Sequence, residues 1–369
     1  MSQDFTTRLQ HELRAAALRE EERGPLSRLR LGLPRPAVLI AGAVAAALLI
    51  AFVLAGGLRW DGEQTITAPR VTTTFPVADT LGLISPGYGS VWAGDPAGRQ
   101  VLRVDTDSRR VTARVPVGDD PAVNAGAGAV WAISFERDVD DNGELVRIDP
   151  ASAEITARAP LRTPAGDPFL ASDVQFADGE PWVLGASGAL RIDAEDGTIT
   201  GFVPIEKRAD DPFPVWGAIA PDGLWMLRRE QRLERYDLDR GRLAQLVPVR
   251  LAGTVAFEPT PAGLVLVTNR GELGLADRKT GRILWTQTLG TGITGVPMLI
   301  GDTLWTHVTD TGGGGDHLAA VDLATGKIRS QTRLPEFGAA GAAVVGERLW
   351  LATPTGKIMI VEPGEQPDG

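Results

Sequence analysis

Five acidic residues stand at matching places in a repeating chain, three of them directly before a proline. They are Asp79, Asp120, Asp167, Asp211 and Glu336, with the aromatic residues Phe169, Phe213 and Trp216 nearby. A ring of carboxylates beside apolar rings could hold a cation or a basic, partly apolar partner. The alternative is that each Asp-Pro pair only begins a surface turn. Carboxylates can bind a cation without performing a reaction, so this set predicts binding rather than catalysis.

A second acidic pattern suits calcium. Asp138, Asp140 and Asn142 precede Gly143 in the order D-x-[DN]-x-[DN]-G, and Asp149 occupies the twelfth position. Alternating oxygen ligands can wrap a calcium ion while the glycine makes a sharp turn. The alternative is an extended hairpin loop with Asn142-Gly143 as its turn. Calcium is the only cofactor that the sequence suggests.

Few other groups could do chemistry. The 369 residues include no cysteine, which excludes disulfides, thiolate nucleophiles and iron–sulfur clusters. Two of the three histidines, His307 and His317, flank a four-glycine segment together with Asp310 and Asp316. A metal could gather these side chains, but ordering so glycine-rich a loop costs entropy. A flexible surface hairpin is the favoured interpretation.

The elements that must position these residues begin with an apolar run. Residues 36–58 contain no charge, and 23 residues at 1.5 Å each span about 34 Å, enough to cross a bilayer. Arginines precede the run, which predicts a cytoplasmic segment at 1–35, a transmembrane helix at 36–58 and a linker at 59–64. A cleaved signal peptide is the alternative, but the long leader favours an anchor in the cell membrane.

The charge differs between the two sides of this run. Residues 1–59 carry 8 basic and 5 acidic residues, net +3, whereas the rest carries 29 basic and 42 acidic, net −13. So acidic an extracytoplasmic part repels phosphate backbones, which argues against a nucleic-acid partner. Apolar residues recur at helical spacing within residues 4–23, which predicts a short amphipathic helix that could dock a cytosolic partner. The alternative is a solvated stub.

From residue 65 to 365 the chain repeats. One slot holds tryptophan in six of seven units, namely Trp92, Trp131, Trp182, Trp225, Leu266, Trp305 and Trp350. Another slot is acidic, namely Asp105, Asp149, Asp193, Asp237, Asp277, Asp322 and Glu362. Steps of 40 to 45 residues built from short strands predict an all-β, seven-bladed β-propeller with four strands in each blade. Each tryptophan is expected to wedge neighbouring blades together, and each aspartate to cap a hairpin turn.

The two ends of the repeat region complement one another. The seventh unit stops after "KIMIVEPG" without a fourth strand, whereas "TITAPRVTTTFPV" is a fourth strand without a preceding blade. Together they would complete the seventh blade. Such closure removes the exposed sheet edges that template aggregation.

Four stretches carry a resemblance to two known families. "LADRKTGRILWTQTLG" and "AVDLATGKIRSQTRLP" resemble the pyrroloquinoline-quinone-like (PQQ-like) propeller repeat. "PVGDDPAVNAGAGAVWAIS" and "LVRIDPASAEITARAPL" resemble bacterial YVTN-type, virginiamycin B lyase-like seven-bladed propellers. These repeats occur in enzymes, scaffolds and sensors alike, so the resemblance implies fold more than activity.

Departures from the enzyme patterns decide the functional expectation. Quinoprotein dehydrogenases typically have eight blades and often a cysteine pair, and the lyases place glutamate soon after the blade tryptophan; neither pattern occurs here. We therefore expect a single-pass membrane protein whose extracytoplasmic propeller is a non-catalytic binding, scaffold or sensor domain. The alternative is a lyase-like or quinoprotein-like enzyme that uses the central funnel.

Overall fold

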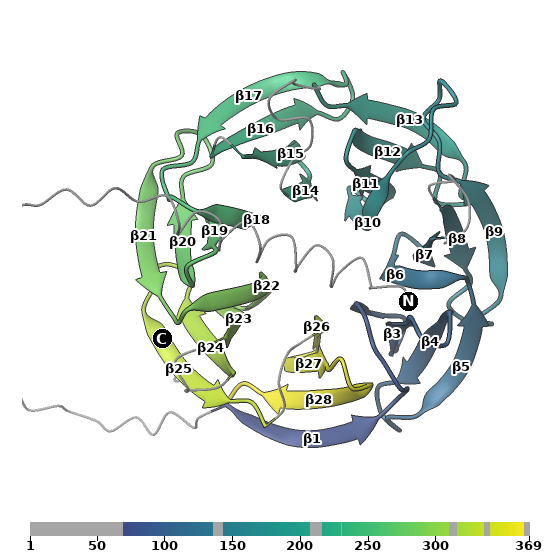
Figure 1. Cartoon of the computed structure of the whole chain (residues 1–369), viewed down its shortest axis with the longest axis horizontal. Helices are drawn as coiled ribbons and strands as arrows, with labels where there is room; N and C mark the ends of the chain where they lie inside the picture. Colours follow the sequence, from purple (N-terminus) through teal and green to yellow (C-terminus); the bar gives the residue numbers. More distant parts are fainter. Residues whose placement is uncertain are drawn as a thin grey trace, which may run out of the picture. The chain divides into compact units, whose positions relative to one another are not determined.

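The computed structural model describes residues 69–135, 143–206, 216–229, 231–309, 316–335 and 340–364. These residues form seven antiparallel four-stranded sheets arranged in a ring, as Figure 1 shows. The fold is a seven-bladed β-propeller, as the repeat predicted. The described residues include no helix long and apolar enough to cross a membrane. The helix predicted at 36–58 lies outside them.

Blades one to three contain twelve strands in sequence order. They are β2 (Ile84–Gly87), β3 (Ser90–Asp95), β4 (Gln100–Asp105) and β5 (Val111–Pro116) in blade one; β6 (Asp119–Gly126), β7 (Ala129–Phe135), β8 (Glu144–Ile148) and β9 (Ile155–Pro160) in blade two; and β10 (Ala171–Ala177), β11 (Glu180–Gly185), β12 (Gly188–Ile192) and β13 (Ile199–Pro204) in blade three. In each blade the first strand is innermost and the fourth is outermost.

Blades four to six repeat this order. They are β14 (Trp216–Ala220), β15 (Gly223–Arg228), β16 (Arg232–Asp237) and β17 (Arg242–Pro248) in blade four; β18 (Thr254–Thr260), β19 (Gly263–Thr268), β20 (Glu272–Ala276) and β21 (Ile283–Thr288) in blade five; and β22 (Gly292–Ile300), β23 (Thr303–Thr309), β24 (His317–Asp322) and β25 (Ile328–Arg333) in blade six.

Blade seven is built from both ends of the propeller. Its strands are β26 (Gly341–Val345), β27 (Arg348–Ala352), β28 (Lys357–Glu362) and β1 (Arg70–Pro76). The outermost strand is β1, which pairs antiparallel with β28 from Arg70↔Glu362 to Pro76↔Lys357. The predicted closure of the ring by the N-terminal strand is confirmed.

The six blade tryptophans are buried between neighbouring sheets. Each is 2% exposed or less, and in four blades an arginine from the third strand lies over the ring, as Arg103 does over Trp92 at 5.7 Å. Arg103 also donates a hydrogen bond to the carbonyl of Ala151 in the next blade. Arg103 therefore packs on the tryptophan of its own blade and links that blade to the following one by a hydrogen bond.

The acidic slot caps the turn between the third and fourth strands. The Asp277 carboxylate, for example, accepts hydrogen bonds from the backbone nitrogens of Lys279 and Thr280, and Gly281 ends the turn at φ +67°. Backbone nitrogens two or three residues on also donate to Asp105, Asp149, Asp193, Asp237 and Asp322. After Asp105 and Asp149 the left-handed residues are Arg109 and Ala153 instead of glycine. Glu362 differs, because it ends a strand that pairs with β1, and its carboxylate forms an ion pair with Arg70 of β1.

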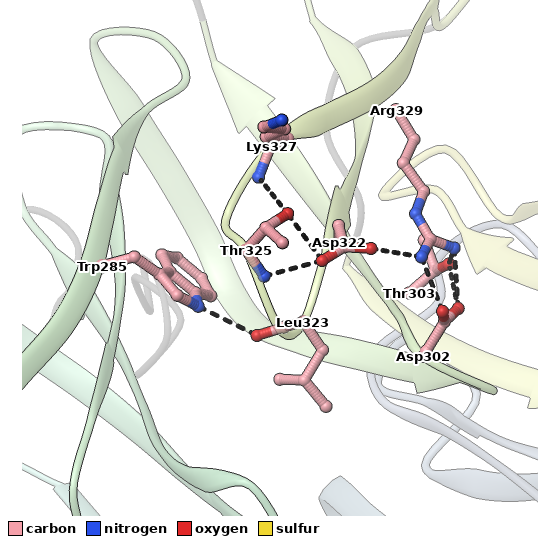
Figure 2. Close-up of polar contacts among 8 residues, drawn as sticks. All are labelled: Trp285, Asp302, Thr303, Asp322, Leu323, Thr325, Lys327 and Arg329. Carbon is pink, nitrogen blue, oxygen red and sulfur yellow. Dashed lines mark hydrogen bonds and ion pairs between the residues drawn. The ribbon is translucent and has the colours of Figure 1, made fainter. Parts of the chain in front are cut away.

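Blade five departs from the tryptophan pattern and compensates for it. Leu266 fills the tryptophan slot, and the fourth strand instead carries Trp285, whose Nε1 donates to the carbonyl of Leu323 in blade six at 2.9 Å (Figure 2). A Cβ at Gly326 would meet this ring at 2.5 Å, so the turn of blade six requires glycine there. The wedge between blades five and six thus comes from a different strand.

Candidate functional site

The propeller has two unlike faces. We call the face where the inner strands begin the connection face, because it bears the connections between blades and the loops between second and third strands. The opposite turn face bears the other hairpin turns. Asp79 and Asp167 lie in the connections before β2 and β10, and Asp120 is the second residue of β6, so the fold places three predicted residues on the connection face of successive blades. Asp211, Phe213 and Glu336 lie outside the described residues.

These three carboxylates differ in surroundings. Asp79 and Asp167 are exposed, whereas Asp120 is half-buried at φ +44°, a left-handed conformation that aspartate tolerates. Its neighbour Asp119 is buried and pairs with Arg99 at 2.7 Å, which anchors the start of β6. Asp79 lines a groove of about 330 Å³ between blades seven and one.

The two predicted aromatic residues that the structure describes also differ in exposure. Trp216 begins β14 and is 36% exposed. Phe169 is fully buried and packs edge-to-face against Phe202 at 6.1 Å. It is a core residue of blades two and three and offers no surface to a partner, so we leave it out of the binding face.

Two further apolar side chains at the starts of inner strands were missed. Leu83 directly precedes β2 and is 43% exposed, and Leu170 directly precedes β10 and is 50% exposed. Together with Trp216 they place large apolar groups on the connection face of blades one, three and four. Large apolar side chains of this kind are common anchors for a partner at protein interfaces. Leu170 follows the predicted Asp167-Pro168 pair closely, which is the signal that could have found it.

A pair of carboxyl groups on the inner strands was also missed. Asp173 on β10 accepts hydrogen bonds from the Asn124 and Gln175 side chains at 2.7 and 3.1 Å and from the Val174 backbone nitrogen. Burial nevertheless raises the pKa of Asp173 to about 6. Burial, with the charge of Asp173, raises the pKa of Glu258 on β18 to about 7. The sequence signal that could have found the pair is a charged residue inside a short strand of mainly small and apolar residues.

Side chains link the inner strands of the first four blades. Ser85, Asn124 and Gln175 each stand opposite the blade tryptophan. The Ser85 hydroxyl accepts from the backbone of β6, the Asn124 amide donates to the Val174 carbonyl of β10, and the Gln175 carbonyl accepts from Ile219 of β14. At the same position, blades four to seven carry Ala218, Phe257, Met298 and Ala343. The acidic pair therefore adjoins the polar part of the ring interior.

Of the four residues proposed to bind calcium, only Asp149 lies within the described residues. Asp138, Asp140 and Asn142 lie outside the described residues. Asp149 caps the turn after β8, and hydrogen bonds from the backbone and hydroxyl of Ser152 lower its pKa. Asp149 therefore already has the same partners as its equivalents in blades without this loop.

The histidine segment of blade six forms one buried contact. His307 Nε2 lies 2.9 Å from Asp316 Oδ2, both side chains are about 95% buried, and burial lowers the pKa of His307. His317 lies near Gln331 instead. Asp310 is outside the described part of the chain, within which no group of three or more potential ligands could hold a metal ion.

A network of ion pairs lies at the turn face of blade six, shown in Figure 2. Arg329 binds both oxygens of Asp302 at 2.7 and 2.6 Å and also contacts Asp322. The hydrogen bonds from Thr325 and Arg329 outweigh burial and lower the pKa of Asp322 to about 2. The same Asp322 caps the turn that receives Trp285, so this cluster is structural.

Comparison with known proteins supports the fold. A family model described as outer membrane protein assembly factor BamB, of the PQQ-like repeat type, matches residues 224–365. The chain is similar to the crystal structure of BamB from Moraxella catarrhalis, with 13% identity and a TM-score of 0.54 over 80% of this chain and 99% of that one. It is also similar to the computationally designed Ika8 protein, with 11% identity and a TM-score of 0.53 over 77% and 96%. No curated protein matches the chain.

These likenesses define the fold, a seven-bladed propeller, and a repeat type for part of it. Residues 224–365 match the PQQ-like repeat, and the expectation drawn from "LADRKTGRILWTQTLG" is confirmed for that part of the chain. The resemblance to YVTN-type propellers stays a prediction. At this identity the solved structures are relatives in fold alone.

Proposed function

We propose that the chain is a single-pass membrane protein whose extracytoplasmic propeller binds a partner at its connection face and performs no chemistry of its own. The observation that carries the proposal is the exposure of Leu83, Leu170 and Trp216 at the starts of inner strands, on the same face as the carboxylates of Asp79, Asp120 and Asp167. Aromatic and aliphatic anchors within a polar rim are the usual anatomy of a protein-binding surface.

The carboxylates favour a basic partner. Charged groups at the rim steer association and are screened by salt, whereas apolar anchors determine how slowly the partner leaves. A protein or peptide that presents basic side chains around an apolar one fits both features. The similar fold named as an assembly factor is consistent with a scaffold role. The uncharged segment at 36–58 would anchor the chain in the cell membrane, with the N-terminus in the cytoplasm.

The test is capture of partners from native membranes by the tagged full-length chain. An anchor variant, Leu170→Ser with Trp216→Ala, and a charge variant, Asp120→Asn with Asp167→Asn, should each lose the partner. A control variant, Tyr88→Asn with Asp178→Asn, changes exposed residues in left-handed turns on the turn face and should retain it. Retention by the anchor and charge variants, or loss only in the control, would refute the assignment of the binding face.

A further inference from the structure

The outer wall of blades four to six exposes large apolar side chains. Leu243 and Leu246 on β17, Leu284 on β21 and Ile328 on β25 are 36%, 48%, 43% and 40% exposed. These strands are the outermost elements of three consecutive blades, as Figure 1 shows. In the described structure, the outer strands of the other four blades expose no large apolar side chain.

The outer strands can be compared at one equivalent position, the bulged residue near the start of each strand. Each outer strand has a bulge near its start, and the bulged residue in blades seven, one, two and three is threonine. All four threonine hydroxyls donate to a carbonyl of the third strand at 3.3 Å; they are Thr72, Thr112, Thr156 and Thr200. In blade five the bulged residue is Leu284, whose side chain is left to solvent. The fold itself does not need an apolar side chain there.

The charges on the same wall are all positive. The three outer strands and their flanks, residues 242–250, 282–289 and 327–334, contain no acidic residue. Five exposed basic side chains stand on them, namely Arg242, Arg250, Arg282, Lys327 and Arg333. None lies within salt-bridge distance of a described acidic group, although the charge of Arg282 adds to the hydrogen bonds from Thr280 in lowering the pKa of Asp277. The outer strand of blade one is also basic, with Arg110 and Arg114 exposed, but it exposes no large apolar side chain, so only the wall of blades four to six combines the two features. Basic side chains beside exposed aliphatic ones suit an anionic lipid surface.

The point where the chain enters the ring lies beside this wall. The carbonyl of Pro69, just before β1, accepts a hydrogen bond from the Thr332 hydroxyl on β25 at 2.6 Å. Ten residues separate Pro69 from the end of the apolar run at Leu58. Even fully extended, ten residues reach only about 35 Å. If residues 36–58 cross the membrane, as the proposed function states, the length of this ten-residue segment limits how far β25 can lie from the lipid surface.

We propose that the outer wall of blades four to six lies against the membrane surface and binds anionic lipid headgroups, with Leu246, Leu284 and Ile328 entering the interface. This inference rests on the membrane anchoring in the proposed function but not on the binding face. It orients the propeller side-on, which leaves the connection face open to a partner alongside the membrane.

The absence of cysteine makes a clean labelling experiment possible. Leu284→Cys and the matched control Thr112→Cys, each carrying a polarity-sensitive fluorophore, are reconstituted as full-length chain in nanodiscs. The discs contain phosphatidylglycerol with phosphatidylcholine, or phosphatidylcholine alone. We expect a blue shift of emission at position 284 in the anionic discs only, and none at 112. Equal emission from the two positions in anionic discs would overturn the proposal.

A charge variant tests the headgroup contact. Arg242→Gln, Lys327→Gln and Arg333→Gln together should abolish the shift of the label at 284 while circular dichroism and the melting temperature stay unchanged. A shift that persists would overturn the role of the basic side chains. A shift seen in native membranes but not in anionic nanodiscs would mean that an acidic protein, and not lipid, covers the wall.

A separate measurement distinguishes failure of this inference from failure of the proposed function. Alkaline carbonate extracts a peripheral protein but not an anchored one. If the chain is extracted, the anchor is absent, and the labelled chain is then added to preformed vesicles. A shift at 284 on phosphatidylglycerol vesicles would still support the lipid-binding wall, and no shift would overturn it.

Discussion

Replacing Glu258 by glutamine should make the propeller more stable above neutral pH and leave it unchanged in acid. Burial and the charge of Asp173 raise the pKa of Glu258 in the folded state to about 7, against an ordinary value of 4.5. The folded state therefore holds the proton more tightly than the unfolded state does. The stability contributed by the protonated form is fully present below pH 4.5 and is lost as pH rises through 7.

The size of the effect follows from the two pKa values. Their difference corresponds to about 3 kcal/mol, and because the side chain is only half-buried, solvent screening reduces this to about 2 kcal/mol. Glutamine keeps the shape without the charge, so at pH 8 the variant should gain about 2 kcal/mol. For a domain of this size that raises the melting temperature by about 3 °C.

The assay is denaturant unfolding at pH values from 4 to 8, for wild type, Glu258→Gln and the exposed control Glu347→Gln. Wild type and control should lose stability between pH 5 and 8 relative to Glu258→Gln. Parallel curves for all three proteins would show that Glu258 ionises as freely in the folded state as in the unfolded chain. The reasoning about its surroundings would then be wrong.

Three further predictions concern other parts of the chain. Deleting Thr65–Val77 removes β1 and should leave blade seven open, so that the propeller aggregates or unfolds; a monomer with an unchanged melting temperature would contradict the closure. Arg329→Gln should cost about 1 to 2 kcal/mol in denaturant unfolding, because it leaves Asp302 and Asp322 without their shared cation, and should return the pKa of Asp322, measured by NMR titration, toward its ordinary value. Millimolar calcium should raise the melting temperature only if the loop beginning at Asp138 is a site. An Asp140→Ala variant that keeps the whole shift would remove that hypothesis.

Much of the architecture could be predicted because the same local sequence pattern specifies each blade of a propeller. The tryptophan slot, the turn-capping aspartates and the period of 40 to 45 residues all lie within one repeat, where neighbours in sequence are neighbours in the blade. The closing strand was predictable for the same reason, since a repeat without a fourth strand and a fourth strand without a repeat define each other.

The candidate sites were harder to predict because they form between repeats. Asp167 and Phe169 are two residues apart, yet one is exposed and the other fully buried, since Phe202 from β13 covers the ring. The local sequence around these two residues does not indicate which of their side chains is buried by the rest of blade three.

The sequence by itself determined the all-β class, the number of blades and the way the ring closes, because hydrophobic alternation and turn residues act over a few positions. Only the tertiary structure decided that the charge of Asp173 raises the pKa of Glu258, 85 residues away in the sequence. The same holds for the exposed side chains of β17, β21 and β25, which share one wall. Electrostatic coupling and surface patches depend on distances through space, and a linear repeat fixes these only after the blades have packed into a ring.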